Sequence, residues 1–112
     1  MRRATALILA TAAITALGAA SAFAATRSVT WNYTPPKTMS ITKNTTVKWT
    51  WRNTGAHNVV IKRGSVTGST VKSSGGVKAS GTYSYKFASA GTFTVFCTPH
   101  INSGMRQTIT VR

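Results

Sequence analysis

The side chains of this sequence that could hold a metal ion are few and lie in two places. The segment from Phe96 to Met105 contains the only cysteine, Cys97, together with His100, while the second of the two histidines, His57, stands far upstream. A thiolate, two imidazole nitrogens and a thioether are soft or borderline ligands. These residue types favour copper, whereas a structural zinc site commonly uses more cysteines. Zinc remains the alternative metal.

The same four side chains also indicate what the metal would do. A trigonal plane of two histidines and one cysteine with a weak axial methionine is the ligand set of blue-copper electron-transfer sites. With four protein ligands no position is left open for a substrate, so the pattern favours electron transfer over catalysis. Taken alone, an isolated methionine often fills core space and an isolated histidine is often a surface residue. The prediction depends on their combination.

Alternating apolar and polar residues predict the strands that would position these side chains. The stretch 47–52 has the pattern of a strand with one buried face, and Cys97 follows Phe93 with the same period of two. We therefore expect Cys97 to point inward at the end of a strand. The expected strands cover 28–33, 38–42, 47–52, 58–62, 82–87, 92–96 and 107–112, with an additional edge strand at 70–73. Seven or eight short strands predict an all-β domain, a small antiparallel sandwich or barrel.

Residues typical of turns separate the expected strands. They occupy 34–36, 53–55, 64–81 and 90–91, of which 64–81 is the least regular. With a turn at 53–55, His57 would stand at the start of the strand that follows. The loop 98–104 would return the chain so that His100 and Met105 face the same point as Cys97. Lysines in and beside 64–81 either discourage edge-to-edge strand pairing or form a docking surface.

Acidic side chains are absent, since the sequence has 14 Lys and Arg but no Asp or Glu, which gives a formal net charge of +14. The chain therefore has no two-carboxylate glycosidase site, no acid to orient a catalytic histidine, and no oxygen-rich calcium or magnesium site. We expect no enzyme. A basic surface favours acidic partners, which include a redox protein, an anionic membrane and a polyanionic cell wall. Nucleic acid is disfavoured, because no groove-reading motif or base-stacking platform is present.

The N-terminus has the features of a secretory signal peptide. Two arginines precede an apolar stretch at 4–20, and residues 22–24 form a small-residue cleavage pattern. We expect a signal peptide at 1–24 and, after cleavage, one domain at 25–112 in the periplasm or outside the cell. A retained membrane anchor is the alternative, although the stretch is short for a spanning helix. In an oxidising compartment the unpaired Cys97 needs an explanation, and metal ligation supplies one.

The order of these residues resembles that of the cupredoxins, and the loop length is similar to that of plastocyanin and pseudoazurin. Cys97 is followed by His100 and Met105 after two and four intervening residues, and His57 begins the run His-Asn-Val-Val. Over 25–112 the resemblance implies a Greek-key β-sandwich with one type 1 copper ion bound by His57, Cys97, His100 and Met105. It also implies that Asn58 ties the two ligand loops together.

The resemblance further implies a route for electrons. Members of the family pass single electrons between larger redox proteins, commonly through the edge of the C-terminal histidine, here His100. The candidate docking patch around it consists of Gly55, Ala56, Pro99 and Ile101. We therefore expect a monomeric electron carrier for redox partners with acidic docking surfaces.

Several positions depart from the plastocyanin pattern. Phe96 replaces the tyrosine that usually precedes the cysteine, and Ala56 replaces the usual proline before the first histidine. Asn102 and Gln107 stand where plastocyanins have glycines, and Asn102 can tolerate a left-handed backbone. The region after Val60 is basic where plant plastocyanins carry acidic patches, so the polarity of the partner would be reversed.

Two other functions stay open. A periplasmic copper carrier or buffer would use the same ligands but would pass on the metal instead of electrons. A cationic module would bind polyanions by charge alone and would need no metal. A copper oxidase or reductase would need further metal ligands, and the sequence has no histidine or cysteine left for them.

Overall fold

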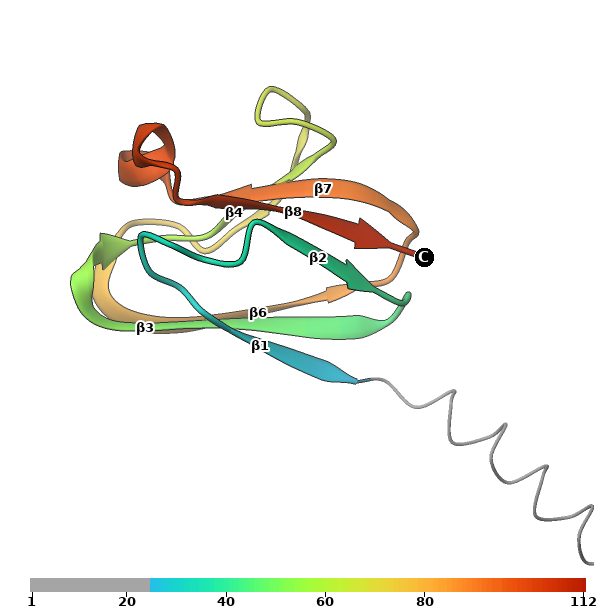
Figure 1. Ribbon diagram of the computed structural model, residues 1–112, viewed down its shortest axis with the longest axis horizontal. Coiled ribbons are helices and arrows are strands. Elements are labelled where there is room, and N and C mark those ends of the chain that lie inside the picture. The colour runs from blue at the N-terminus through green and yellow to red at the C-terminus, as the bar shows by residue number, and fades with distance from the viewer. Residues whose placement is uncertain (1–24) are drawn as a thin grey trace, which may run out of the picture.

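The computed structural model describes residues 25–112, and in this range eight strands form two sheets that pack face to face (Figure 1). The strands are β1 (Thr26–Thr30), β2 (Thr38–Ile41), β3 (Thr45–His57), β4 (Val60–Arg63), β5 (Thr70–Ser73), β6 (Lys78–Phe87), β7 (Gly91–Phe96) and β8 (Arg106–Val111), and the 3-10 helix η1 (Thr98–Ser103) precedes β8. The predicted all-β sandwich is confirmed. The expected signal peptide at 1–24 lies outside the described residues. Within 25–112, no helix is long and apolar enough to span a membrane.

The two sheets differ in size and in the direction of their strands. One sheet has three strands in the order β1-β3-β6, and the other has five in the order β2-β8-β7-β4-β5. Most neighbours are antiparallel, but β1 runs parallel to β3 and β2 runs parallel to β8. Between β1 and β3 the chain crosses to the other sheet to form β2, so no hairpin joins these neighbours. The sequence did not indicate the two parallel pairs, because local strand patterns carry no information on such crossovers.

Aromatic side chains from both sheets fill the space between them. Along β3, Trp49 and Trp51 are buried and alternate with exposed polar residues, as the period of two predicts. The Trp49 ring packs edge-to-face against Trp31 and Phe87, with centroids 6.4 Å apart in both pairs. Its indole N–H donates to Gln107 Oε1 at 2.7 Å, which joins the three-stranded sheet to β8 of the other sheet.

Strand β3 is longer than the sequence predicted. The expected turn at 53–55 is wrong, since Asn53, Thr54 and Gly55 lie within β3, where the pairing with β6 shifts register between Arg52 and His57. Asn53 and Gly55 adopt positive φ angles of 53° and 103°, which explains why residues typical of turns occur at this bulge. As a result, His57 is the last residue of β3 and not the first of the next strand.

The other strands lie close to the predicted ranges. The edge strand expected at 70–73 is present as β5, the outermost strand of its sheet. Strand β1 stops at Thr30, earlier than predicted, although the backbone N–H of the next residue, Trp31, still donates to the Thr50 carbonyl of β3 at 2.8 Å. Strand β6 begins at Lys78, inside the stretch 64–81 that the sequence indicated as irregular, because β6 also pairs with the end of the long β3, where Lys78 lies opposite His57.

Candidate metal centre

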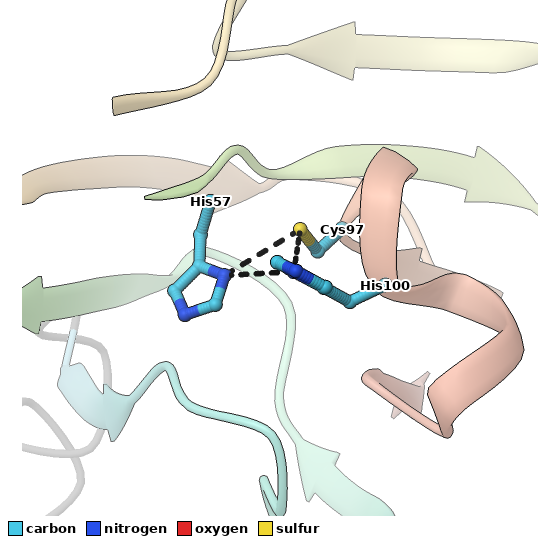
Figure 2. A group of neighbouring side chains, drawn as sticks. All are labelled: His57, Cys97 and His100. Atoms are coloured by element: carbon cyan, nitrogen blue, oxygen red, sulfur yellow. Dashed lines mark hydrogen bonds between the residues drawn. The ribbon is translucent and has the colours of Figure 1, made fainter. Parts of the chain in front are cut away.

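Three side chains that can bind metal meet at the end of the sandwich where β3 and β7 end. Cys97 follows β7 and is completely buried, His57 ends β3, and His100 lies on η1. The Sγ of Cys97 is 3.7 Å from Nδ1 of His57 and 3.4 Å from Nδ1 of His100, and the two Nδ1 atoms are 3.1 Å apart. Figure 2 shows the three donor atoms facing one another. In the described part of the chain, no other group of His, Cys and acidic side chains could hold a metal ion.

The spacing and chemistry of these donors suit a transition-metal ion. An ion about 2.0 Å from each imidazole nitrogen and about 2.3 Å from the sulfur, in the plane of the three, needs donors about 3.5 to 3.8 Å apart. The donor atoms here are 3.1 to 3.7 Å apart, close to that range. A sulfur and two imidazole nitrogens suit copper better than ions that prefer oxygen. The residues present therefore fit copper.

The loop 98–104 is a short 3-10 helix, which the sequence analysis did not anticipate. Pro99 lies in its first turn, where the missing N–H of proline is not needed. The N–H of His100 donates to the Cys97 carbonyl at 3.2 Å, so one tight turn carries both ligand candidates. Gly104 ends the helix in the left-handed conformation, with φ of 86°, and its N–H donates to the Ile101 carbonyl.

Met105 follows this helix and is completely buried. Its N–H donates to the His100 carbonyl at 3.3 Å, and its carbonyl accepts the N–H of Cys97 at 3.2 Å. These two backbone hydrogen bonds keep Met105 next to the segment that carries Cys97 and His100. The structure thus brings all four predicted metal-binding residues to the same end of the sandwich.

His57 is completely buried, and this burial is the main reason why the pKa of its imidazole is lowered. The nearby His100 lowers this pKa further, whereas a hydrogen bond with the backbone of Thr54 partly opposes the shift. A lowered pKa keeps the imidazole neutral at neutral pH, as a metal ligand must be. Its Nε2 lies 3.2 Å from the Thr54 hydroxyl, which leaves Nδ1 directed toward Cys97. The sequence pattern did not single out Thr54, because its contact with His57 depends on the bulge in β3.

Asn58 lies between the two segments that carry the ligand candidates. Its Oδ1 accepts the backbone N–H of Thr98 at 2.8 Å, and its Nδ2 donates to Thr98 Oγ1 at 3.1 Å and to the Gly75 carbonyl at 3.0 Å. Because Asn58 follows His57 and Thr98 follows Cys97, this double contact connects the immediate neighbours of two ligand candidates.

The residues of the expected docking patch are neighbours of the two histidines in the chain. Gly55, Ala56 and Pro99 are exposed, and Ile101 is half-buried. His100 is itself half-buried.

Three positions that depart from the plastocyanin pattern differ in their burial and contacts. Phe96 is buried at the end of β7. Gln107 is also buried, where it accepts the hydrogen bond from Trp49 and donates through Nε2 to the Pro36 carbonyl at 3.0 Å. Asn102 is exposed on η1 with an ordinary negative φ.

Tyr33 is a further residue of the site that the sequence analysis missed. Its ring packs edge-to-face against both His57 and His100, and its hydroxyl lies 3.3 Å from Nε2 of His100. Tyr33 belongs to the segment between β1 and β2 and precedes two prolines in the sequence. Nothing in its spacing links it to a histidine far along the chain. An aromatic residue at the end of an expected strand, just before a turn, is the only signal that could have found it, and that signal is weak.

Comparison with known sequences shows the family of the chain. A sequence profile described as copper binding proteins of the plastocyanin/azurin family matches residues 23–112. The chain belongs to this family, the cupredoxins. The plastocyanin of Prochlorothrix hollandica is 32% identical to this cupredoxin over 114 residues, which cover 94% of this chain and 87% of that protein.

Solved structures of other cupredoxins share the fold. An oxidised mutant of amicyanin superposes with a TM-score of 0.61 at 26% identity, over 80% of this chain and 90% of that chain. The oxidised plastocyanin of Dryopteris crassirhizoma superposes with a TM-score of 0.60 over 76% of this chain and 99% of that chain, and at 19% identity it supports the fold alone. Family membership makes copper the metal of this centre and blue-copper electron carriers the general class of the protein.

Proposed function

We propose that this cupredoxin is an exported carrier of single electrons between redox proteins, with one type 1 copper ion held by His57, Cys97, His100 and Met105. The observation that carries the proposal is the approach of two imidazole nitrogens and one cysteine sulfur to within 3.7 Å of one another, beside a buried methionine. Copper bound there would supply one-electron chemistry by changing between Cu(II) and Cu(I). The histidines would bind through Nδ1, and Met105 would be the weak fourth ligand.

The surrounding residues would hold the ligands in one arrangement. His57 and Cys97 are completely buried at strand ends, and Asn58 bonds to Thr98 beside them. Ligands held by packed strands and by outer hydrogen bonds move little, so one geometry can serve both oxidation states. This favours electron transfer over metal delivery, since delivery needs ligands that let the metal go easily.

We infer no catalytic role for the protein. Both histidines and the only cysteine are used in one centre, so residues 25–112 offer no second cluster for a metal that activates substrate. The sequence also has no carboxylate for acid–base catalysis. A relay of electrons needs neither.

The proposed partner is a redox protein with an acidic docking surface. Gly55, Ala56, Pro99 and Ile101 would form the apolar part of the contact. Twelve basic side chains on the domain at 25–112 would attract the partner from a distance, which speeds association and is screened by salt. The same charge would favour association of the monomer with an anionic membrane or cell wall.

A groove beside the metal centre supports this polarity. It has a volume of about 560 Å³, and its lining includes Lys37, Gly104 and Arg106 among uncharged residues. Gly104 precedes Met105 in the chain, and its carbonyl accepts a hydrogen bond from Nζ of Lys37 at 2.9 Å. Carboxylates of a partner that entered the groove would therefore dock close to the proposed copper site.

The proposal of export rests on the N-terminal segment. A signal peptide at 1–24 would be removed to leave the domain at 25–112 in the periplasm or outside the cell. The family profile begins to match at residue 23, which agrees with a domain that starts near the expected cleavage site. A buried, metal-bound Cys97 would also be protected in an oxidising compartment.

Voltammetry of the copper-loaded protein tests electron transfer against the alternatives. We expect one reversible one-electron wave and slow transfer of copper to a competing chelator. Fast transfer of the metal without a reversible wave would instead show a copper carrier or buffer. A protein that takes up no copper, but whose affinity for a polyanion falls steeply with salt, would be a cationic binding module.

A further inference from the structure

Tyr33 is one of two large hydrophobic residues that are exposed in the described part of the chain, the other being Val77. Although 43% of its surface is exposed, its ring is not free. It packs edge-to-face against His100, with centroids 4.7 Å apart, and against His57, with centroids 5.3 Å apart. The ring therefore lies between the two histidines and solvent.

The hydroxyl of Tyr33 makes a polar contact with one of these histidines. It lies 3.3 Å from Nε2 of His100, while Nδ1 of the same imidazole is 3.4 Å from the Cys97 sulfur. His57 is held in a similar way, with Nε2 at 3.2 Å from the Thr54 hydroxyl. A hydrogen bond to the second nitrogen of a metal-binding histidine sets its tautomer and ring orientation. Each of the two histidines thus has one hydroxyl group next to its Nε2 that can set its tautomer and ring orientation.

The segment that carries Tyr33 is anchored on both sides. Before it, the indole N–H of Trp31 donates to the Asn58 carbonyl at 2.9 Å. After it, the Pro36 carbonyl accepts a hydrogen bond from Nε2 of the buried Gln107 at 3.0 Å. These bonds hold the chain on either side of Tyr33 against the end of the sandwich that carries the metal centre. The fold therefore fixes the position of the Tyr33 ring.

Gly55 in the bulge of β3 provides space for the tyrosine. A Cβ at this position would lie 2.5 Å from Oη of Tyr33 and 3.4 Å from Cε1 of His57. Any larger residue would therefore push the Tyr33 hydroxyl away from its place. Two segments far apart in the sequence are thus shaped to fit each other over the histidines.

We propose that Tyr33 is a hydrogen-bonded cover over His100, which holds the imidazole through Nε2 and shields it from solvent and from direct contact with a redox partner. The family resemblance implies that a partner touches the exposed edge of His100. Under this proposal the partner would touch the ring of Tyr33 instead. The roles of copper and of the partner rest on the function proposed above, but the contact itself can be tested in the metal-free protein.

NMR of the metal-free protein tests the contact, with the neutral nitroxide TEMPOL as the probe of solvent access. Tyr33→Phe removes only the hydroxyl and should shift the Nε2 resonance of His100. Tyr33→Ala removes the ring as well and should increase the relaxation of the His100 ring protons by TEMPOL several-fold. Tyr85→Phe is the matched control, because Tyr85 is half-buried on β6 and packs on Phe87; it should change neither signal. Unchanged His100 signals in both Tyr33 variants would overturn the proposal.

Copper release gives an independent measurement of the positioning role. Loss of an outer hydrogen bond to a ligand weakens metal binding by roughly 10- to 100-fold. The copper-loaded Tyr33→Phe protein should therefore release its metal to excess EDTA about tenfold faster than the unmodified protein, and Tyr85→Phe should not. Equal release rates would contradict the positioning role of Tyr33. Failure of the unmodified protein to bind copper would contradict the proposed function instead, and the NMR comparison would still decide whether Tyr33 covers His100.

Discussion

The two histidines of the metal centre use their ring nitrogens in the same way. In each, Nδ1 faces the Cys97 sulfur and Nε2 meets a hydroxyl group, from Thr54 for His57 and from Tyr33 for His100. Such outer contacts orient a metal-binding imidazole and affect its basicity. Residues that do not touch the metal should therefore influence how tightly it is held.

Removing the hydroxyl beside His57 should weaken copper binding. Thr54→Val keeps the shape of the side chain but leaves Nε2 of His57 without its partner, and the expected loss of copper affinity is roughly 10- to 100-fold. Competition with a chelator of known affinity measures the change. Thr50→Val, at an exposed position of the same strand, is the control and should bind copper like the unmodified protein. Equal affinities for the two variants would refute the role of Thr54.

The sequence predicted the four metal-binding candidates but not their hydroxyl partners. Cys97 and the two histidines could be identified because the chain has no other residues of these types. Threonine and tyrosine occur at many positions, so their types alone single out none of them. Thr54 reaches His57 only because of the bulge in β3, and Tyr33 reaches His100 only because a distant segment folds over the site.

Strand β3 contributes to both the core and the metal centre. Its first half buries tryptophans against the other sheet, and its bulged second half ends in the buried His57. The positive φ angles of Asn53 and Gly55 allow the strand to shift register and still continue its pairing with β6. The position of His57 therefore depends on the backbone of this bulge.

Replacing Gly55 should disturb the bulge. Gly55→Ala places a side chain at φ of 103° and brings its Cβ to 2.5 Å from the Tyr33 hydroxyl oxygen. A residue other than glycine in such a conformation costs about 1–3 kcal/mol, so the free energy of unfolding of the metal-free protein should fall by about that amount. Denaturant titration measures it. Gly76→Ala is the control, since a Cβ there meets no atom within 4 Å, and it should change stability by less than about 0.5 kcal/mol.

The elements were predictable where the period of two continued and unpredictable where distant pairing decided the structure. The alternation along 47–52 correctly placed Trp49 and Trp51 in the core. The same reasoning failed at 53–55, because Asn-Thr-Gly is typical of a turn, whereas here it forms a bulge between two stretches of β3 that pair with β6. The parallel pairs β1 with β3 and β2 with β8 likewise depend on crossovers that no local pattern reveals.

The charge of the whole molecule has consequences for stability as well as for partners. Twelve basic side chains occur at 25–112, and the sequence contains no acidic side chain that could pair with any of them. Their mutual repulsion must be offset by the core, and it should be strongest at low ionic strength.

Salt should therefore stabilise the metal-free protein. Raising the ionic strength from about 10 mM to about 150 mM shortens the Debye length from about 30 Å to about 8 Å, which screens repulsion between the basic side chains. The melting temperature should rise over this range. Lys48→Gln, at an exposed position of β3, removes one charge and should reduce the dependence on salt. A melting temperature that stays constant or falls with added salt would show that charge repulsion has little effect on stability.

The visible absorption spectrum of the protein loaded with one equivalent of Cu(II) tests the central claim most directly. A centre built from His57, Cys97, His100 and Met105 should give an intense blue colour that arises from the bond between the Cys97 thiolate and Cu(II). Cys97→Ser should lose this colour. A pale spectrum for the unmodified protein, or an intense band that survives in Cys97→Ser, would contradict the proposed type 1 copper centre.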